Sequence, residues 1–181
     1  DGKYYYSATQ VNFNNETLRV SGSSSNVILK LTNATTSISI GGGSGELRVD
    51  PGCSLEIYAP GDVTIAGNGI MNGSTTLASA NQPVALQIYG TKTSGTQDIE
   101  IKGNGVLSAV VYAPQGSVTI NGNGDVCGSV VANDITLVGN AYFHYDESLG
   151  NLGGNNPFRI SIWQELTSAG SRSPFSSALA F

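Results

Sequence analysis

Apolar and polar residues alternate along short stretches of the chain, and nearly the same stretch recurs four times. Apolar residues flank a single polar residue in Val63–Ile65, Ile99–Ile101, Val118–Ile120 and Ile135–Leu137. Alternation with a period of two predicts strands that bury one face. A Gly-Asn pair follows each strand, and both residue types tolerate the positive φ of a tight turn. The pattern therefore predicts short strands that end in similar turns.

The recurring stretches define a repeat unit. They begin at Leu55, Leu86, Ala109 and Ser129, and the asparagines of their Gly-Asn pairs are Asn68, Asn104, Asn123 and Asn140. The step from the first of these asparagines to the second is about twice as long as the later two, because it holds the polar insertions "STTLASANQP" and "TKTSGTQ". Without the insertions all three steps agree with a basic period of roughly 18 residues, and such a regular period indicates stacked repeats. The four asparagines are therefore expected to form a structural ladder.

A coil of this length cannot bury its apolar side alone, whereas stacked coils share one continuous core. The repeat therefore predicts an all-β fold, a right-handed parallel β-helix or β-solenoid of roughly 18-residue coils with irregular terminal caps. An antiparallel sandwich is the alternative, but it does not predict near-identical units. We expect one domain over residues 1–181. Residues 1–54 would form degenerate early coils and an N-terminal cap, 55–149 the regular coils, and 150–181 a capping segment and tail.

Composition narrows the class of protein. Charged residues make up 12% of the 181 residues, against roughly 25% in an average soluble domain. The net charge of −5 argues against nucleic acid as a partner, because such partners require clustered Lys and Arg. No apolar run approaches the roughly 20 residues of a membrane span, so we expect no direct membrane insertion in this segment. A surface of Ser, Thr, Asn and Gly favours an extracellular or cell-surface protein.

The stretch "VYAPQGSVTINGNGDVCGSVVANDITLVGNAYFHYDESL", residues 111–149, resembles a bacterial family. It is similar to the C-terminal solenoid region of PilX-like proteins associated with type IV pili. "DGKYYYS" and "SIWQEL" are similar to the opening and closing segments of that region. The family's N-terminal hydrophobic helix is not in this sequence. The resemblance implies a noncatalytic structural or adhesion domain on the bacterial surface, with pilus components as partners and no catalytic residues to carry over.

His144 and Asp146 are the first candidates for chemistry. One interpretation is a His–Asp pair that serves as a base or binds a metal. The other is a hydrogen-bonding motif that closes the last coil. One imidazole with one or two carboxylates makes a poor set of metal ligands. The sequence therefore favours the structural motif. The acidic residues are scattered along the coils, and nothing favours the paired carboxylates of a polysaccharide-degrading enzyme. We therefore expect no enzyme, no cofactor and no metal.

Tyr58, Tyr89 and Tyr112 occupy the same position in three successive repeats. The alternation directs all three outward, and stacked strands lie about 4.8 Å apart. The three rings are therefore expected to form a partly exposed column on one face. They would serve as a self-stacked ladder that stabilises the fold, or as a platform for surface glycans or a partner protein. The ladder is the preferred interpretation.

Cysteines and glycosylation sequons are two features often linked to secretion. The repeat places Cys53 and Cys127 three coil steps apart, roughly 14 Å, whereas a disulfide needs Cα atoms within about 7 Å. Both are therefore expected to be free thiols. Asn-x-Ser/Thr sequons begin at Asn15, Asn33 and Asn72. In a chain so rich in Asn and Thr we expect them to be chance matches.

Overall fold

The computed structural model describes residues 2–72, 82–103, 107–122, 126–139, 142–146 and 149. The chain divides after Leu149, and all of these residues belong to the unit of residues 1–149. The predicted capping segment 150–181 lies outside the described residues. So do three members of the predicted asparagine ladder, Asn104, Asn123 and Asn140.

The described residues form strands, as the alternation of apolar and polar residues predicts, and all but β12 and β13 are short. The strands are β1 (Lys3–Ala8), β2 (Val11–Asn14), β3 (Thr17–Val20), β4 (Asn26–Leu31), β5 (Thr36–Gly41), β6 (Glu46–Val49), β7 (Ser54–Ala59), β8 (Asp62–Ile65), β9 (Gly69–Asn72), β10 (Leu86–Gly90), β11 (Gln97–Gly103), β12 (Leu107–Gly122), β13 (Val126–Gly139) and β14 (Phe143–Tyr145). A 3-10 turn, η2 (Pro83–Ala85), precedes β10.

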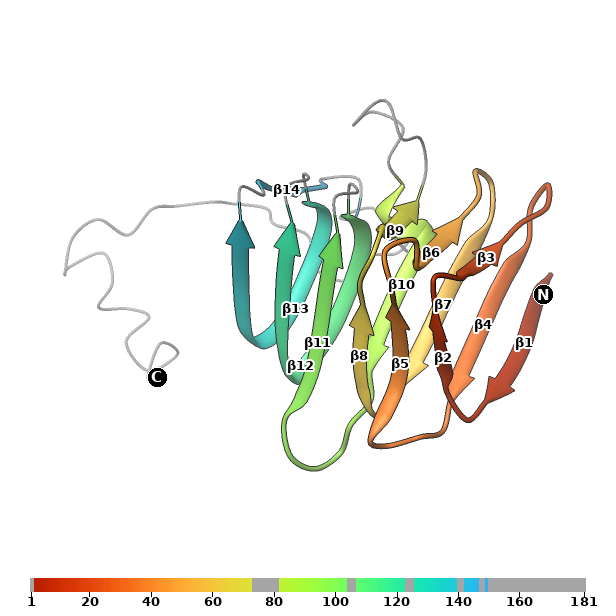
Figure 1. The fold of residues 1–181 in the computed structure, drawn as a ribbon. Coiled ribbons are helices and arrows are strands. Elements are labelled where there is room, and N and C mark those ends of the chain that lie inside the picture. The colour runs from red at the N-terminus through yellow and green to blue at the C-terminus, as the bar shows by residue number, and fades with distance from the viewer. Residues whose placement is uncertain are drawn as a thin grey trace, which may run out of the picture. The chain divides into compact units, whose positions relative to one another are not determined.

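Every strand pairing in the described unit is parallel, and paired strands are not consecutive in the chain until β11. One row runs β1-β4-β7-β10 and a second runs β2-β5-β8-β11. The two rows join at β12, whose first half pairs with β10 and whose second half pairs with β11. The resulting eleven-stranded sheet curls until it is nearly closed, beside a three-stranded sheet β3-β6-β9 (Figure 1). The all-β, all-parallel prediction is confirmed, and the antiparallel sandwich is wrong.

The sequence separation between paired strands changes along the chain. From β11 onward the separation is short, and Gln97 on β11 pairs with Gly116 on β12. The pairings of β12 with β13 and of β13 with β14 are similarly close in sequence. These steps agree with the predicted period of about 18 residues. The steps from β1 to β4, β7 and β10 are longer, as for Leu55 and its partner Leu86, because each also contains a strand of the three-stranded sheet.

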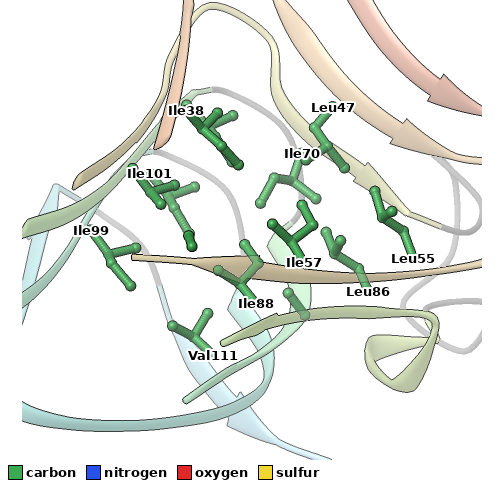
Figure 2. Packing of buried hydrophobic residues seen from close by; sticks show 14 of the residues in the cluster. Ile38, Leu47, Leu55, Ile57, Ile70, Leu86, Ile88, Ile99, Ile101 and Val111 are labelled. Atoms are coloured by element: carbon green, nitrogen blue, oxygen red, sulfur yellow. The ribbon is translucent and has the colours of Figure 1, made fainter. Parts of the chain in front are cut away.

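The core is built from columns of apolar side chains, one residue from each paired strand. Ile57, Ile88 and Val111 form one such column across β7, β10 and β12. Ile99 and Ile101 face them from the second row, and Leu47 and Ile70 come from the three-stranded sheet. Figure 2 shows these side chains pointing into one shared interior. All are almost completely buried, and each contributes roughly 1.5–3 kcal/mol by leaving water.

Candidate binding site

The three predicted tyrosines lie side by side on the outward face of the first row. Tyr58 on β7 pairs in register with Tyr89 on β10, and Tyr89 pairs with Tyr112 on β12. The column continues toward the N-terminus through Lys30 on β4 and Ser7 on β1. The structure therefore brings the three tyrosines together at the positions that the repeat predicts. Their role in binding remains a prediction.

The three rings are not arranged alike. Tyr58 and Tyr89 stack with ring centroids 5.0 Å apart and planes 12° from parallel. Tyr112 lies 6.4 Å from Tyr89 with its plane tilted by 56°, and 47% of it is exposed. Because Tyr58 and Tyr89 turn their faces toward each other, this pair forms the expected ladder, and such contacts stabilise a fold by about 0.5–1.5 kcal/mol.

Hydrogen bonds along each strand hold the stacked pair in place. The Tyr58 hydroxyl donates to Glu56 Oε2 over 3.4 Å, and the Tyr89 hydroxyl donates to Gln87 Oε1 over 2.6 Å. Glu56 also pairs with Lys3, with Nζ and Oε1 2.9 Å apart. The pKa of each phenol is raised, first because burial disfavours the phenolate and then because negative charge lies nearby. Both phenols therefore remain protonated donors at neutral pH.

An open groove of about 880 Å³ adjoins the N-terminal end of the tyrosine column. Its lining includes Tyr5, Ile28, Lys30, Tyr58 and Pro60, which come from β1, β4, β7 and the turn after β7. Tyr89 covers one face of the Tyr58 ring, and Tyr58 is the member of the three-tyrosine column that lines the groove. Sequence reasoning missed this groove, because the stretches that form β1 and β4 contain none of the repeated phrases that fixed the register of the tyrosines.

Most of the chain matches one known protein family. The family DUF7305, described as a domain of unknown function, matches residues 1–152 of the chain. The chain belongs to this family. No curated protein and no solved structure matches the chain. The DUF7305 match spans all the described strands and the groove, so the tyrosine column lies within the family's domain.

No helix in the part of this DUF7305 chain that the structure describes is long and apolar enough to cross a membrane.

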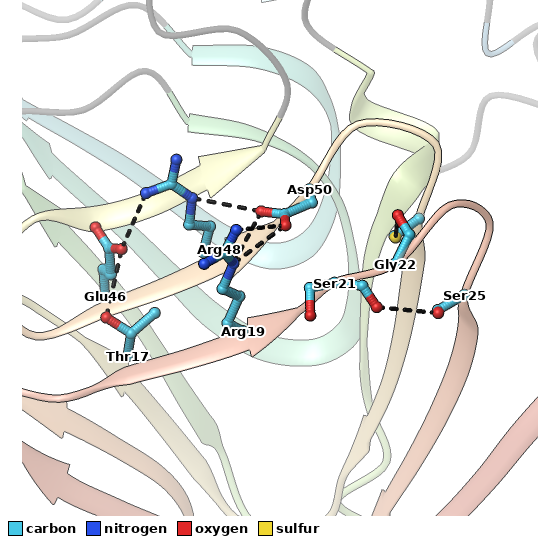
Figure 3. Close-up of polar contacts among 9 residues, drawn as sticks. Thr17, Arg19, Ser21, Gly22, Ser25, Glu46, Arg48 and Asp50 are labelled. Atoms are coloured by element: carbon cyan, nitrogen blue, oxygen red, sulfur yellow. Dashed lines mark hydrogen bonds and ion pairs between the residues drawn. The ribbon is translucent and has the colours of Figure 1, made fainter.

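A polar cluster lies on the three-stranded sheet of the DUF7305 domain (Figure 3). Arg19 on β3 and Arg48 on β6 are register partners, so two like charges lie side by side. Asp50 bonds to Arg19 Nη2 at 2.7 Å and pairs with Arg48 Nε at 3.5 Å. The pKa of Asp50 is lowered, first because Arg19 donates a hydrogen bond to its carboxylate. The Asp50 carboxylate compensates the positive charges of both arginines. The cluster therefore links β3 to β6, and this structural role explains why these residues lie together.

His144 and Asp146 lie at the end of the described unit. His144 is exposed on β14 and pairs in register with Cys127, while the Asp146 backbone N–H donates to Gly128 O over 3.3 Å. The described residues contain no group of three His, Cys, Asp or Glu side chains that could hold a metal ion. The proposed role of the pair in closing the last strand stays a prediction.

Asn68, within the described part of the asparagine ladder, donates its backbone N–H to Gly45 O over 2.8 Å.

Neither Cys53 nor Cys127 forms a disulfide, as the repeat predicts. Cys53 is buried just before β7, and its Sγ lies 3.4 Å from the carbonyl oxygen of Gly22. Cys127 is partly exposed on β13. Strands β7 and β13 are three steps apart in the sheet, which explains why the two sulfurs are not joined.

Two of the three sequon asparagines use their amide nitrogens inside the fold. Asn72 is buried, and its Nδ2 donates to Gln82 O over 2.7 Å and to Ser108 O over 3.0 Å. Asn33 Nδ2 donates to Gln10 Oε1 over 2.8 Å. A glycan would attach at these nitrogens, so glycosylation of the folded domain would break the contacts.

Proposed function

We propose that this chain is a noncatalytic structural and adhesion domain at the bacterial cell surface, wound as a right-handed β-solenoid. The observation that carries the proposal is the parallel pairing of strands from β1 to β13 around one core of buried apolar side chains, which runs from Val20 to Ile120. Such stacking makes a stiff scaffold with long outward faces, and proteins built this way commonly use those faces for binding. A scaffold of this kind suits display outside the cell.

Two observations support the proposed location. The chain is rich in Ser, Thr, Asn and Gly, and only 12% of its residues are charged. The phrases "YAP" and "FHYDESL" resemble PilX-like proteins associated with type IV pili, so pilus components are the proposed partners. Extracellular or cell-surface display is therefore the proposed localisation.

This proposal predicts that the natural full-length gene product is accessible on intact bacteria. Cells that produce it with an epitope inserted at the exposed Gly95 should bind antibody without permeabilisation, because that turn lies on the surface. Sheared pili should carry the protein, and deletion of its gene should reduce attachment. Antibody access only after permeabilisation would contradict the proposal, and an untagged strain is the control.

Carbohydrate binding by the tyrosine column is the second candidate function. The observation that favours it is the tilt of Tyr112, which leaves this ring partly exposed beside a rigid stacked pair. An exposed aromatic face on a rigid support can pack against the apolar face of a sugar ring. Tyr58 and Tyr89 would then act by holding Tyr112 in position.

A glycan array therefore should show binding that depends on Tyr112. Tyr112→Ala should weaken glycan binding about tenfold, since a lost aromatic contact costs on the order of 1 kcal/mol or more. Tyr145→Ala is the matched control, because Tyr145 is also exposed but lies on β14. Equal binding by Tyr112→Ala and the wild type would contradict a platform at this ring. Release of reducing sugar from the bound glycans would instead indicate a polysaccharide-degrading enzyme.

A further inference from the structure

The groove beside Tyr58 contains a cation that no acidic group of the described residues offsets. Five of the six Lys and Arg residues in the described part of the chain form ion pairs. These pairs are Lys3–Glu56, Arg19–Asp50, Arg48 with Glu46 and Asp50, Lys92–Asp62 and Lys102–Glu100. Lys30 is the sixth, and it makes no ion pair with any described residue. Its exposed side chain lies in the groove.

The surroundings of Lys30 combine charge with aromatic and apolar surface. Tyr58 is its register partner on β7, and Tyr5 lines the groove from β1. Ile28, two residues earlier on the same outward face of β4, adds apolar surface. A ligand that fills this groove should therefore carry one anionic group for Lys30 and a flat or apolar ring face for the tyrosines.

We propose that this groove binds a carboxylate-bearing sugar residue of an acidic polysaccharide. Its carboxylate would pair with the Lys30 ammonium, and the C–H face of its ring would pack against Tyr58, whose other face is supported by Tyr89. The hydroxyls of Thr32 and Thr91, which also line the groove, can bond to sugar hydroxyls. The groove volume lies within the roughly 300–1,000 Å³ typical of small-molecule sites.

The local electrostatics permit an anion here although the chain carries a net charge of −5. Glu56 belongs to the neighbouring column on β7, in register with Ile28. Its carboxylate is offset by Lys3 and accepts the Tyr58 hydroxyl. Glu56, the acidic residue nearest to the groove in the strand register, is therefore already paired with Lys3. The Lys30 ammonium is not paired with any described carboxylate. This inference deepens the adhesive role proposed above and rests on it.

The test compares acidic sugars with neutral counterparts that keep the same rings. Trigalacturonate, hyaluronan tetrasaccharide and sialyllactose, each also as its methyl ester, would be titrated calorimetrically into the full chain. At least one acid should bind more tightly than its ester, and added salt should weaken that binding because the contact is exposed. Lys30→Gln should reduce the affinity about tenfold, the scale of one hydrogen bond to a charged group. Lys30→Arg should retain most of it.

Lys102→Gln is the matched control, because Lys102 is also a surface lysine but pairs with Glu100 on β11. It should bind the acidic sugars as the wild type does. Equal affinity for acids and esters, or unchanged binding by Lys30→Gln, would overturn the inference while leaving an adhesive role intact. Binding of an acidic peptide such as tetraglutamate but of no acidic sugar would also overturn it. Absence of all glycan binding would overturn both this inference and the carbohydrate-binding candidate, and the structural role would remain.

Discussion

A Gln97→Glu variant is expected to lose about 3–5 kcal/mol of unfolding free energy, the usual consequence of leaving a buried charge without a partner. Gln97 is 2% exposed at the start of β11. Its Nε2 donates to the carbonyl oxygens of Ala59, over 2.9 Å, and Gly61, over 2.6 Å. A carboxylate cannot donate to either carbonyl and would repel both. Urea denaturation followed by circular dichroism at neutral pH measures the loss.

The same exchange at Gln10 provides the control. Gln10 is exposed, and its Oε1 accepts a hydrogen bond from Asn33 Nδ2 over 2.8 Å. A carboxylate keeps that acceptor, so Gln10→Glu should change the unfolding free energy by no more than about 0.5 kcal/mol. If Gln97→Glu proved as stable as Gln10→Glu, the two carbonyls would not depend on the Gln97 amide.

Truncation of Ile57 to Ala is expected to cost about 2–5 kcal/mol of unfolding free energy. Ile57 is completely buried on β7, between Leu29 of β4 and Ile88 of β10 in one apolar column. Removing three carbons leaves a cavity that paired strands on both sides prevent from collapsing. Ile57→Val removes a single carbon and should cost only about 0.5–1.5 kcal/mol. Denaturant titration of both variants checks the difference.

Ile28→Ala serves as the positional control, because Ile28 is on the outward face of β4 and only partly buried. The same truncation there should cost clearly less than it does at Ile57. A larger loss at Ile28 than at Ile57 would mean that the outward face, and not the interior, supplies most of the stability.

The positions of the tyrosines could be predicted because the chain repeats itself there. "LEIYA", "LQIYG" and "VVYA" align without ambiguity, and the alternation assigns each residue to the inside or the outside. The structure places these phrases on β7, β10 and β12 with Tyr58, Tyr89 and Tyr112 in register. What the pattern could not give was the difference between the rings, since their tilt depends on packing around each side chain.

Other features depend on contacts that no periodicity reveals. Gln97 looks like part of a polar insertion in the sequence, yet it is the first residue of β11 and buried. Its burial is possible only because its amide meets the backbone carbonyls of Ala59 and Gly61, which lie far earlier in the chain. The groove at Lys30 likewise depends on the pairing of β1 with β4 and of β4 with β7. The separations between those strands differ from the period of the later repeats, so the repeat could not align them.

The spacing of paired strands has a consequence for how the chain folds. Among the described strands, the register partners that lie farthest apart in sequence belong to β8 and β11, as with Val63 and Ile99. Loop closure over such a distance costs little more than over half of it, because the entropic cost rises only with the logarithm of length. Each strand can therefore pair with an earlier neighbour soon after it leaves the ribosome, without waiting for the C-terminus. The domain can therefore grow in one direction during synthesis. Each new strand covers the unpaired edge of an earlier strand and leaves only its own edge unpaired.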